Sequence, residues 1–372
     1  MQRDGQTIKR PRNWGASSCA NGLVVALLIN ASCGSPQEFR KTEELELGGE
    51  LRTLERPFTR VSGLVESDPG MVMVADEAEK TVQLFDLRNS SIRTVGRIGR
   101  GPSEYLRPRE LLRFRSDSVL LHDSGNGRFL VVSHDGTPGR VIAIPDWAAG
   151  EVVGADGEGR IYLRTHPGVS GSERNDSTRL LRWNPDAEAV DTLLSLQEAT
   201  QSIRVIGPSQ ETTALVIPTP FSPEDGCIVT LGGDVVVARA HPFRVEWWSG
   251  ARLRKRGPVQ PYDPVKVTAA DRRPYERPGF QVAFEWPEHK PPFMRRHLFT
   301  SRDARRIWLR RTTSNGDTAR YDVFGRTGEL IVRVRLPGRR RVVGIGHEHI
   351  FVARADEMDL QWIEVYPDPL AR

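Results

Sequence analysis

The chain of 372 residues is 38% hydrophobic and 27% charged, so it can bury a core of full domain size and is too apolar to be disordered throughout. Its 34 glycines and 26 prolines are spread along the chain, which is typical of a fold with many turns and few helices. Of the formal charge of +5, the five charged residues before position 13 contribute +3; the remaining +2 argues against a nucleic-acid-binding protein.

The first 33 residues have the layout of an export signal. A basic region that ends at Arg12 precedes the apolar run Gly22–Ile29, which is far short of the roughly 20 residues needed to span a bilayer. Ala31-Ser32-Cys33 then resembles a bacterial lipobox, in which the cysteine is lipidated and becomes the new N-terminus. Asn30 departs from the aliphatic residue usual at its position. We predict a leader over residues 1–33 with lipidation at Cys33.

A tether is expected over residues 34–42, and an ordinary cleaved signal or an uncleaved leader are the alternatives to lipidation. Export places the protein in the bacterial cell envelope, on a membrane and facing the periplasm or the exterior. Cys19 and Cys33 lie in the leader and Cys227 is alone in the body, so no disulfide is expected in the mature domain. Cys227 is therefore interpreted as a small buried hydrophobic residue.

A pair of short strands recurs six times after the tether. The first run of each pair lacks strict alternation, as expected of a strand that is covered on both faces, and the second run is rich in β-branched and aromatic residues. The predicted pairs are Met71–Asp76 with Val82–Asp86, Val119–Asp123 with Arg128–Ser133, Ile161–Thr165 with Thr178–Asn184, Val235–Arg239 with Phe243–Trp248, Ile307–Arg311 with Ala319–Phe324, and Ile350–Arg354 with Gln361–Tyr366.

The first strands of successive pairs start 48, 42, 74, 72 and 43 residues apart, which brackets the period of about 40–50 residues of a propeller blade. We therefore predict an all-β six-bladed β-propeller of four-stranded antiparallel blades over residues 43–372. The two long intervals require insertions at 166–176, 197–225 and 257–293. Within the last of these, Asp263 and Pro264 predict a short helix over Val265–Arg273.

Ring closure predicts one more strand. The segment Glu43–Leu54 has strand character, whereas the last pair ends at Tyr366 with no further strand after it. We expect the N-terminal strand to complete the last blade, which removes the exposed edges that invite aggregation.

Two stretches carry a family resemblance. Val95–Tyr105, followed by Pro108, is similar to a glycine-rich loop between blades that usually ends in Gly-Pro-Gly-Glu-Phe, and Pro287–Phe293 is similar to a Pro-Pro-Phe start of a late blade. These motifs resemble those of six-bladed β-propeller proteins of bacterial cell envelopes, relatives of the NHL-repeat propellers. The resemblance implies this fold and this location rather than an activity. Arg100 and Ser103 replace an acidic residue and a glycine that are common in the loop.

Five residues are candidates for ligand binding. Arg97, Arg100, Glu104 and Arg109 are predicted to present charged groups at one face of the ring, the alternative being a sharp connection between blades. Trp286 lies inside an insertion and is a candidate for lining a ligand groove, whereas packing between blades is the alternative for a tryptophan.

The sequence predicts no metal site and no catalytic set. The sequence pattern does not predict that histidines from different segments meet at one metal ion; the candidates are His122-Asp123, His134-Asp135 and His347-Glu348-His349. No Gly-x-Ser-x-Gly motif of a nucleophilic serine is present. Propellers that hydrolyse lactones hold a calcium ion near the axis. Acids at strand ends, such as Asp76 and Asp86, leave calcium as an open alternative.

These observations favour an exported, lipid-anchored β-propeller that acts as a binding module for a protein, peptide or glycan at one face of the ring. We expect a monomer with no cofactor and no nucleic-acid partner, attached to the membrane only through its N-terminal lipid. The alternative is a metal-dependent hydrolase or lyase of the lactonase type. The sequence does not identify the ligand.

Overall fold

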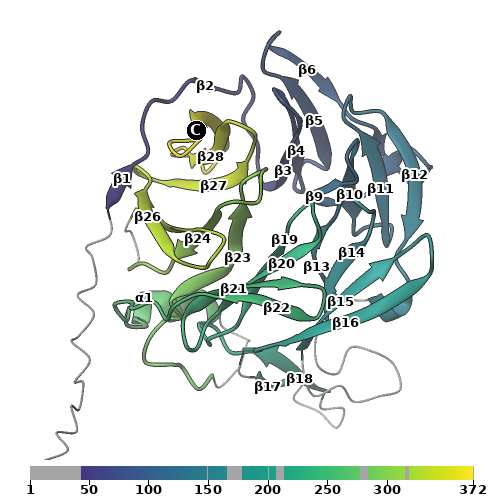
Figure 1. Ribbon diagram of the computed structural model, residues 1–372. Helices are drawn as coiled ribbons and strands as arrows, with labels where there is room; N and C mark the ends of the chain where they lie inside the picture. Colours follow the sequence, from purple (N-terminus) through teal and green to yellow (C-terminus); the bar gives the residue numbers. More distant parts are fainter. Residues whose placement is uncertain are drawn as a thin grey trace, which may run out of the picture. The chain divides into compact units, whose positions relative to one another are not determined.

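The structure, a computed structural model, describes residues 43–148, 150–165, 178–199, 201–206, 213–276, 284–314 and 318–371, with only the backbone described at 201–206 and 213–216. The leader and the tether predicted over residues 1–42 lie outside the described residues. The described chain is almost entirely β, and six antiparallel sheets are arranged as a ring (Figure 1), which confirms the predicted six-bladed β-propeller. All six predicted strand pairs are present.

Each blade contains four antiparallel strands, which in blades A to E follow one another outward from the axis in sequence order; in blade F the outermost strand comes from the N-terminal segment. Blade A contains β3 (Val61–Asp68), β4 (Met71–Asp76), β5 (Thr81–Asp86) and β6 (Ser91–Thr94), and blade B contains β9 (Pro108–Phe114), β10 (Ser118–Asp123), β11 (Arg128–Ser133) and β12 (Pro138–Ala143). Blade C contains β13 (Glu151–Ala155), β14 (Ile161–Arg164), β15 (Thr178–Asn184) and β16 (Ala189–Leu196), and blade D contains β19 (Gly226–Val229), β20 (Asp234–Arg239), β21 (Arg244–Ser249) and β22 (Arg252–Arg256). Blade E contains β23 (Phe293–Thr300), β24 (Ile307–Arg311), β25 (Arg320–Phe324) and β26 (Leu330–Arg335), and blade F contains β27 (Arg340–Ile345), β28 (His349–Ala355) and β29 (Gln361–Pro367), with β2 (Arg52–Thr53) as its outermost strand.

The ring closes through the N-terminal segment. β2 pairs antiparallel with β29, so that Arg52 lies opposite Val365, and this confirms that an N-terminal strand completes the last blade. The innermost strand of every blade contacts that of the next, and β27 of the last blade contacts β3 of the first. The ring of blades is therefore continuous.

The segment predicted as one strand over Glu43–Leu54 divides between two blades. Its first part, β1 (Glu44–Glu46), pairs parallel with β26 and adds a fifth strand to blade E. Gly49 then adopts a φ of +74°, which turns the chain, and β2 follows on blade F. Leu47 and Leu54 are buried on the two sides of this turn, so the segment ties adjacent blades together.

The hydrophobic core lies between the blades. The second strand of each blade is its most buried: in β4, the side chains of Val72, Met73 and Val74 have no exposed surface. Successive side chains of a strand point to opposite faces, so Met73 packs toward blade B with Val119, whereas Val72 packs toward blade F with Phe351. Both faces of the second strands are covered, which explains their unbroken apolar runs.

The two ends of the ring differ. All six innermost strands begin at the same end, which we call the loop face, because each is reached by a connection from the rim of the preceding blade. The long connections lie there: residues 95–107 with β7 (Arg97–Ile98) and β8 (Glu104–Tyr105), residues 197–225 with β17 (Gln201–Ile206) and β18 (Thr213–Pro218), and residues 257–292. The opposite end, the turn face, carries short turns such as 69–70 and 230–233. The connection 144–150 on the loop face holds a single helical turn, η1 (Asp146–Ala148).

The predicted helix over Val265–Arg273 is wrong in its start. The helix α1 covers only Ala269–Arg272, and a 3-10 turn, η2 (Arg273–Tyr275), follows it. Thr268 caps α1 in a reciprocal pair with Asp271, whereas Val265 and Val267 are extended and hydrogen-bonded to the 288–290 segment. Within the described residues, no helix has the length and apolar character that a membrane crossing requires.

The closing segment can be tested with two leucines. Leu54 is 4% exposed and packs with Phe58 and Ile363 between blades F and A, whereas Leu51 is 57% exposed. We expect Leu54→Ala to lower the free energy of unfolding by about 2–5 kcal/mol, because it leaves a cavity where the ring closes. Leu51→Ala, on the same segment, should change it by less than about 0.5 kcal/mol. Equal effects in chemical denaturation would contradict the proposed closure.

Candidate functional site

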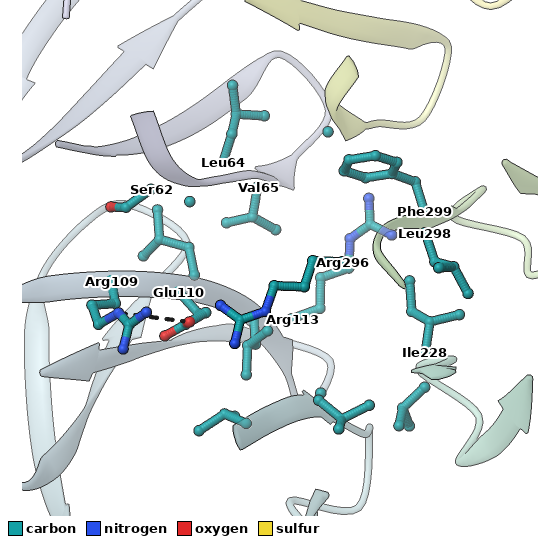
Figure 2. Close-up of a pocket in the computed structure, with 18 of the residues that line it drawn as sticks. Ser62, Leu64, Val65, Arg109, Glu110, Arg113, Ile228, Arg296, Leu298 and Phe299 are labelled. Carbon is teal, nitrogen blue, oxygen red and sulfur yellow. Dashed lines mark ion pairs between the residues drawn. The ribbon is translucent and has the colours of Figure 1, made fainter. Parts of the chain in front are cut away.

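The candidate site is the central channel of the propeller. Residues from all six innermost strands line one cavity of about 460 Å³. Figure 2 shows part of its wall, where the charged groups of Arg109, Glu110, Arg113 and Arg296 share the cavity with apolar side chains. A cavity of this size suits a small ligand or the end of a larger one.

One part of the wall is apolar. Leu64 and Val65 of β3, Ile228 of β19, and Leu298 and Phe299 of β23 line it together (Figure 2). They come from three different blades, so the apolar surface depends on ring closure. It offers contact to the uncharged part of a ligand while the charged side chains orient the rest.

An irregularity in β23 supplies two arginines. Phe293 pairs with Arg311 and Leu298 pairs with Leu309, so the intervening residues of β23 outnumber those of its partner and form a bulge. Arg295 and Arg296 lie in this bulge and line the channel. A bulge redirects side chains that regular pairing would place on alternating faces.

These two arginines belong to a network of ion pairs near the loop face. Arg295 pairs with Glu151 at the start of β13 and, at 2.8 Å, with Glu224 from the connection before blade D. Arg296 lies 3.3 Å from Glu151. Burial works against the charge of Arg295, but the two carboxylates outweigh it and raise the pKa of its guanidinium.

Arg164 extends the network inside the protein. This side chain at the end of β14 is 1% exposed, lies 3.3 Å from Glu198 and 3.7 Å from Glu224, and donates to the carbonyl of Asp225 at 2.5 Å. It therefore joins the connection before blade D to the channel wall. Cys227 lines the channel beside this network, where burial raises the pKa of its thiol to about 12. The thiol is thus not a nucleophile at neutral pH.

A histidine and a glutamate form a second pair on blade B. The Nδ1 atom of His122 lies 2.6 Å from Oε2 of Glu110, which lines the channel next to Arg109. Burial alone would raise the pKa of Glu110, but the hydrogen bond and charge of His122 outweigh burial, so the pKa lies below its ordinary value. Glu110 is therefore a carboxylate at neutral pH.

Arg113 lines the channel and has no carboxylate partner among the described residues. The same holds for three arginines whose charges act on Arg113 or on His297, namely Arg302, Arg310 and Arg341. Arg113 donates to the carbonyl of Ile345 at 2.9 Å; burial, and then the charge of Arg302, lower its pKa to about 10. The electrostatic potential of the channel is correspondingly positive.

The pKa of His297 is lowered by burial and by the same positive charges. Burial, followed by the charges of Arg310, Arg341 and Arg296, lowers the pKa of its imidazole to about 3. His297 is therefore neutral at physiological pH, and the guanidinium groups provide the positive charge here.

The predicted residues of the glycine-rich loop lie on the loop face between blades A and B. Arg97 pairs with Glu104 at 2.7 Å, and the backbone N–H of Gly101 donates to Glu104 at 2.6 Å. The hydrogen bond from Gly101, and then that from Arg97, hold the pKa of Glu104 below its ordinary value. Arg128 donates to the carbonyl of Arg100, so the loop is fixed largely by its own contacts. None of Arg97, Arg100 and Glu104 lines the channel, and a binding role for them stays a prediction.

Arg109 and Trp286 occupy different places. Arg109 lines the channel at the second position of β9, 3.9 Å from Glu110. Trp286 is half-buried in an aromatic cluster on the loop face with Phe221, Tyr275 and Phe284, whose ring centroids lie 5.1–6.4 Å from its own. The cluster joins the two long connections that flank blade D. The structure brings Arg109 into the cavity, whereas Trp286 is not among the residues that line it, and the ligand contact of Trp286 stays a prediction.

The aspartates at strand ends accept hydrogen bonds from backbone N–H groups. Asp76 accepts hydrogen bonds from the N–H groups of Thr59 and Arg60 just before β3, and Asp123 accepts from Leu106 and Arg107 just before β9. The same capping therefore holds the connection into two consecutive blades. In the described parts of the chain, no three histidine, cysteine, aspartate or glutamate side chains are grouped as metal ligands.

Most channel residues were not identified from the sequence. Arg113, Glu151, Arg295 and Arg296 lie on innermost strands, whose side chains face solvent in the channel and so lack a continuous apolar run. The signal available was positional: in a blade, the strand before each apolar pair is the innermost one. Charged residues there would have been channel candidates.

The comparisons with known proteins show the fold. No protein-family model and no curated protein sequence matches the chain. Its structure is similar to an exported-protein candidate from Bacteroides fragilis (TM-score 0.53, 9% identity, covering 88% of this chain and 99% of that one) and to a member of the DUF4221 family from Bacteroides vulgatus (TM-score 0.51, 10% identity, 88% and 100%). A gluconolactonase from Xanthomonas campestris has a TM-score of 0.47, with 10% identity over 85% and 89% of the two chains. The structural similarity to the two Bacteroides proteins shows a shared fold and no shared activity.

A calcium titration tests the lactonase alternative. Glu110 and Glu151 of the channel already pair with His122 and with Arg295 and Arg296, so we expect about 1 mM calcium to leave the melting temperature unchanged. A site with a dissociation constant one hundred times lower would instead add about 2.7 kcal/mol of stability. Stoichiometric calcium in the purified protein, with destabilisation by a chelator, would revive that alternative.

Proposed function

We propose that the protein is an exported binding module of the bacterial cell envelope, which takes up its ligand at the loop face of the propeller. One observation carries this proposal: the long connections and the charged residues at the start of the innermost strands meet at the same end of the ring. A rigid scaffold that presents long connections beside a cavity is the usual construction of a binding site. The turn face has short turns and offers much less surface for recognition.

The cellular location rests on the leader. The basic region and the apolar run Gly22–Ile29 support export, and Cys33 supports lipid attachment. A similar fold in a candidate exported protein is consistent with this location. The protein would then be held at a membrane surface by its N-terminal lipid, as a monomer.

The ligand class is a protein, peptide or glycan of the envelope. The aromatic cluster around Trp286 supplies surface that suits either an apolar side chain or a sugar ring, and Tyr275 within it is 42% exposed. The paired carboxylates of the channel favour binding over metal-dependent hydrolysis, because Glu151 and Glu224 already neutralise guanidinium groups.

Blocking one face at a time tests the binding surface. Val259 lies on the loop face and is 54% exposed, and Asn89 is exposed in a turn at the opposite end. In chains lacking residues 1–33, Val259→Cys and Asn89→Cys would each be coupled to a polyethylene glycol chain. We expect the polymer attached at position 259 to abolish retention of the protein on isolated sacculi or outer-membrane vesicles, and the polymer attached at position 89 to leave retention unchanged. Loss only from position 89, or no retention by the unmodified protein, would contradict the proposal.

The lipid anchor has a separate test. We expect Cys33→Ala to move the protein from the membrane fraction to the soluble fraction, because an anchored protein loses its membrane affinity with its acyl chains. Cys19→Ala is the matched control and should leave fractionation unchanged. Membrane association that persists in Cys33→Ala would contradict lipidation.

A further inference from the structure

We propose that the central channel binds the anionic oxygen group, a carboxylate or a phosphate, of a small ligand, and that Arg113 is its principal contact. This inference rests on the proposed binding function and specifies the chemistry of a ligand group that reaches from the loop face through the channel to Arg113, near the turn-face end of β9. It concerns a residue that the sequence did not single out.

The first observation is an imbalance of charge. Of the described residues that line the cavity, six are arginines, namely Arg60, Arg109, Arg113, Arg164, Arg295 and Arg296, and three are glutamates, namely Glu77, Glu110 and Glu151. Glu198 and Glu224 neutralise part of this excess through Arg164 and Arg295. Arg113 is different, because it forms no ion pair with any carboxylate in the described part of the chain. Its charge is left for an external partner.

The second observation concerns hydrogen bonds. Arg113 uses one Nη atom to donate to the carbonyl of Ile345, while its Nε is buried without an acceptor. Arg302 lies close enough to add its charge, and its Nη1 is likewise buried without an acceptor. The Nε atoms of Arg164 and Arg295 also lack an acceptor, but both guanidinium groups have a carboxylate within 3.3 Å. Arg113 and Arg302 combine buried donors with the absence of any ion pair in the described part of the chain, and this combination indicates a place where an anionic acceptor binds.

The carboxylate of Glu66 acts on Arg113 through its charge but is engaged by backbone groups. Glu66 is 1% exposed and its charge acts on Arg113, but its two oxygens accept the backbone N–H groups of Gly70, at 3.0 Å, and of His347. It therefore fixes the turn-face ends of blades A and F. The guanidinium of Arg113 retains donors that Glu66 does not satisfy.

The surroundings define the rest of the ligand. Val65 and Phe299 line the same cavity as Arg113 (Figure 2), so the group that carries the charge would be attached to a partly apolar skeleton. A guanidinium fork is suited to planar carboxylates and to phosphates alike. Anionic oxygen is thus the shared chemistry, and affinity measurements distinguish the two sources.

Calorimetric titration of the chain without residues 1–33 tests the inference, with citrate, inorganic phosphate and uncharged glycerol as probes. We expect citrate or phosphate to bind, with an affinity that falls as the sodium chloride concentration is raised, while glycerol gives no binding signal. Tighter binding of citrate assigns a carboxylate ligand, and tighter binding of phosphate assigns a phosphate ligand. Absence of binding by both anions would overturn the inference.

Arg113→Met separates the channel from general surface charge. It should fold, because methionine keeps an unbranched, polarizable side chain and removes a buried guanidinium without a carboxylate partner. We expect its affinity for the preferred anion to fall at least tenfold, with Arg113→Lys in between. Arg252→Met, on the exposed outer strand β22, is the control and should bind like the native chain. Equal anion binding by Arg113→Met and the native chain would overturn the inference.

Retention on the envelope fractions distinguishes this inference from the proposed function. If the native chain is retained on sacculi or vesicles but binds neither anion, the channel assignment fails while the binding module stands. If Arg113→Met loses both anion binding and retention while its circular dichroism and melting curve match the native chain, both proposals are supported together.

Discussion

Closure of the ring is the constraint on which the other features depend. Hydrogen bonds between β2 and β29 join the start of the chain to its end, and burial of Leu54 on the same segment fills the space between the last blade and the first. Once closed, the ring fixes six innermost strands around one axis, each starting at the same end. The cavity, its apolar wall and its charges all result from that arrangement. No single blade contains them.

The channel shows why arginine is used so heavily near the axis. The innermost strands cannot be wholly apolar, because their inner faces line a cavity that holds water or ligand. Arg295 meets this requirement with carboxylates from other segments, and so it also holds blades together. Arg113 differs, because it has no carboxylate partner in the described part of the chain and its Nε is buried without an acceptor. A buried guanidinium that gains no internal carboxylate is best explained by an external anion.

The sequence predicted the parts of the fold that are buried on both faces. The second and third strands of each blade carry an apolar signal, because every side chain there meets a neighbouring blade. The innermost strands carry no such signal, so Arg113 and Glu151 went unnoticed while the exposed loop around Arg97 drew attention. Contacts over long distances in the chain also escaped detection: the 288–290 segment keeps Val265 extended, and β1 reaches blade E. A local sequence pattern cannot predict either contact, because the residues that meet are far apart in the chain.

Hydrogen–deuterium exchange with and without a saturating anion tests the central claim most directly. We expect citrate or phosphate to slow exchange in β9, which contains Arg113, and in the innermost strands β23 and β27, and to leave exchange in the rim strands β6 and β22 unchanged. Protection confined to the rim or to the turns 87–90 and 250–251 would contradict it. So would a uniform change over the whole ring, because a site in the channel must act first on the strands that form it.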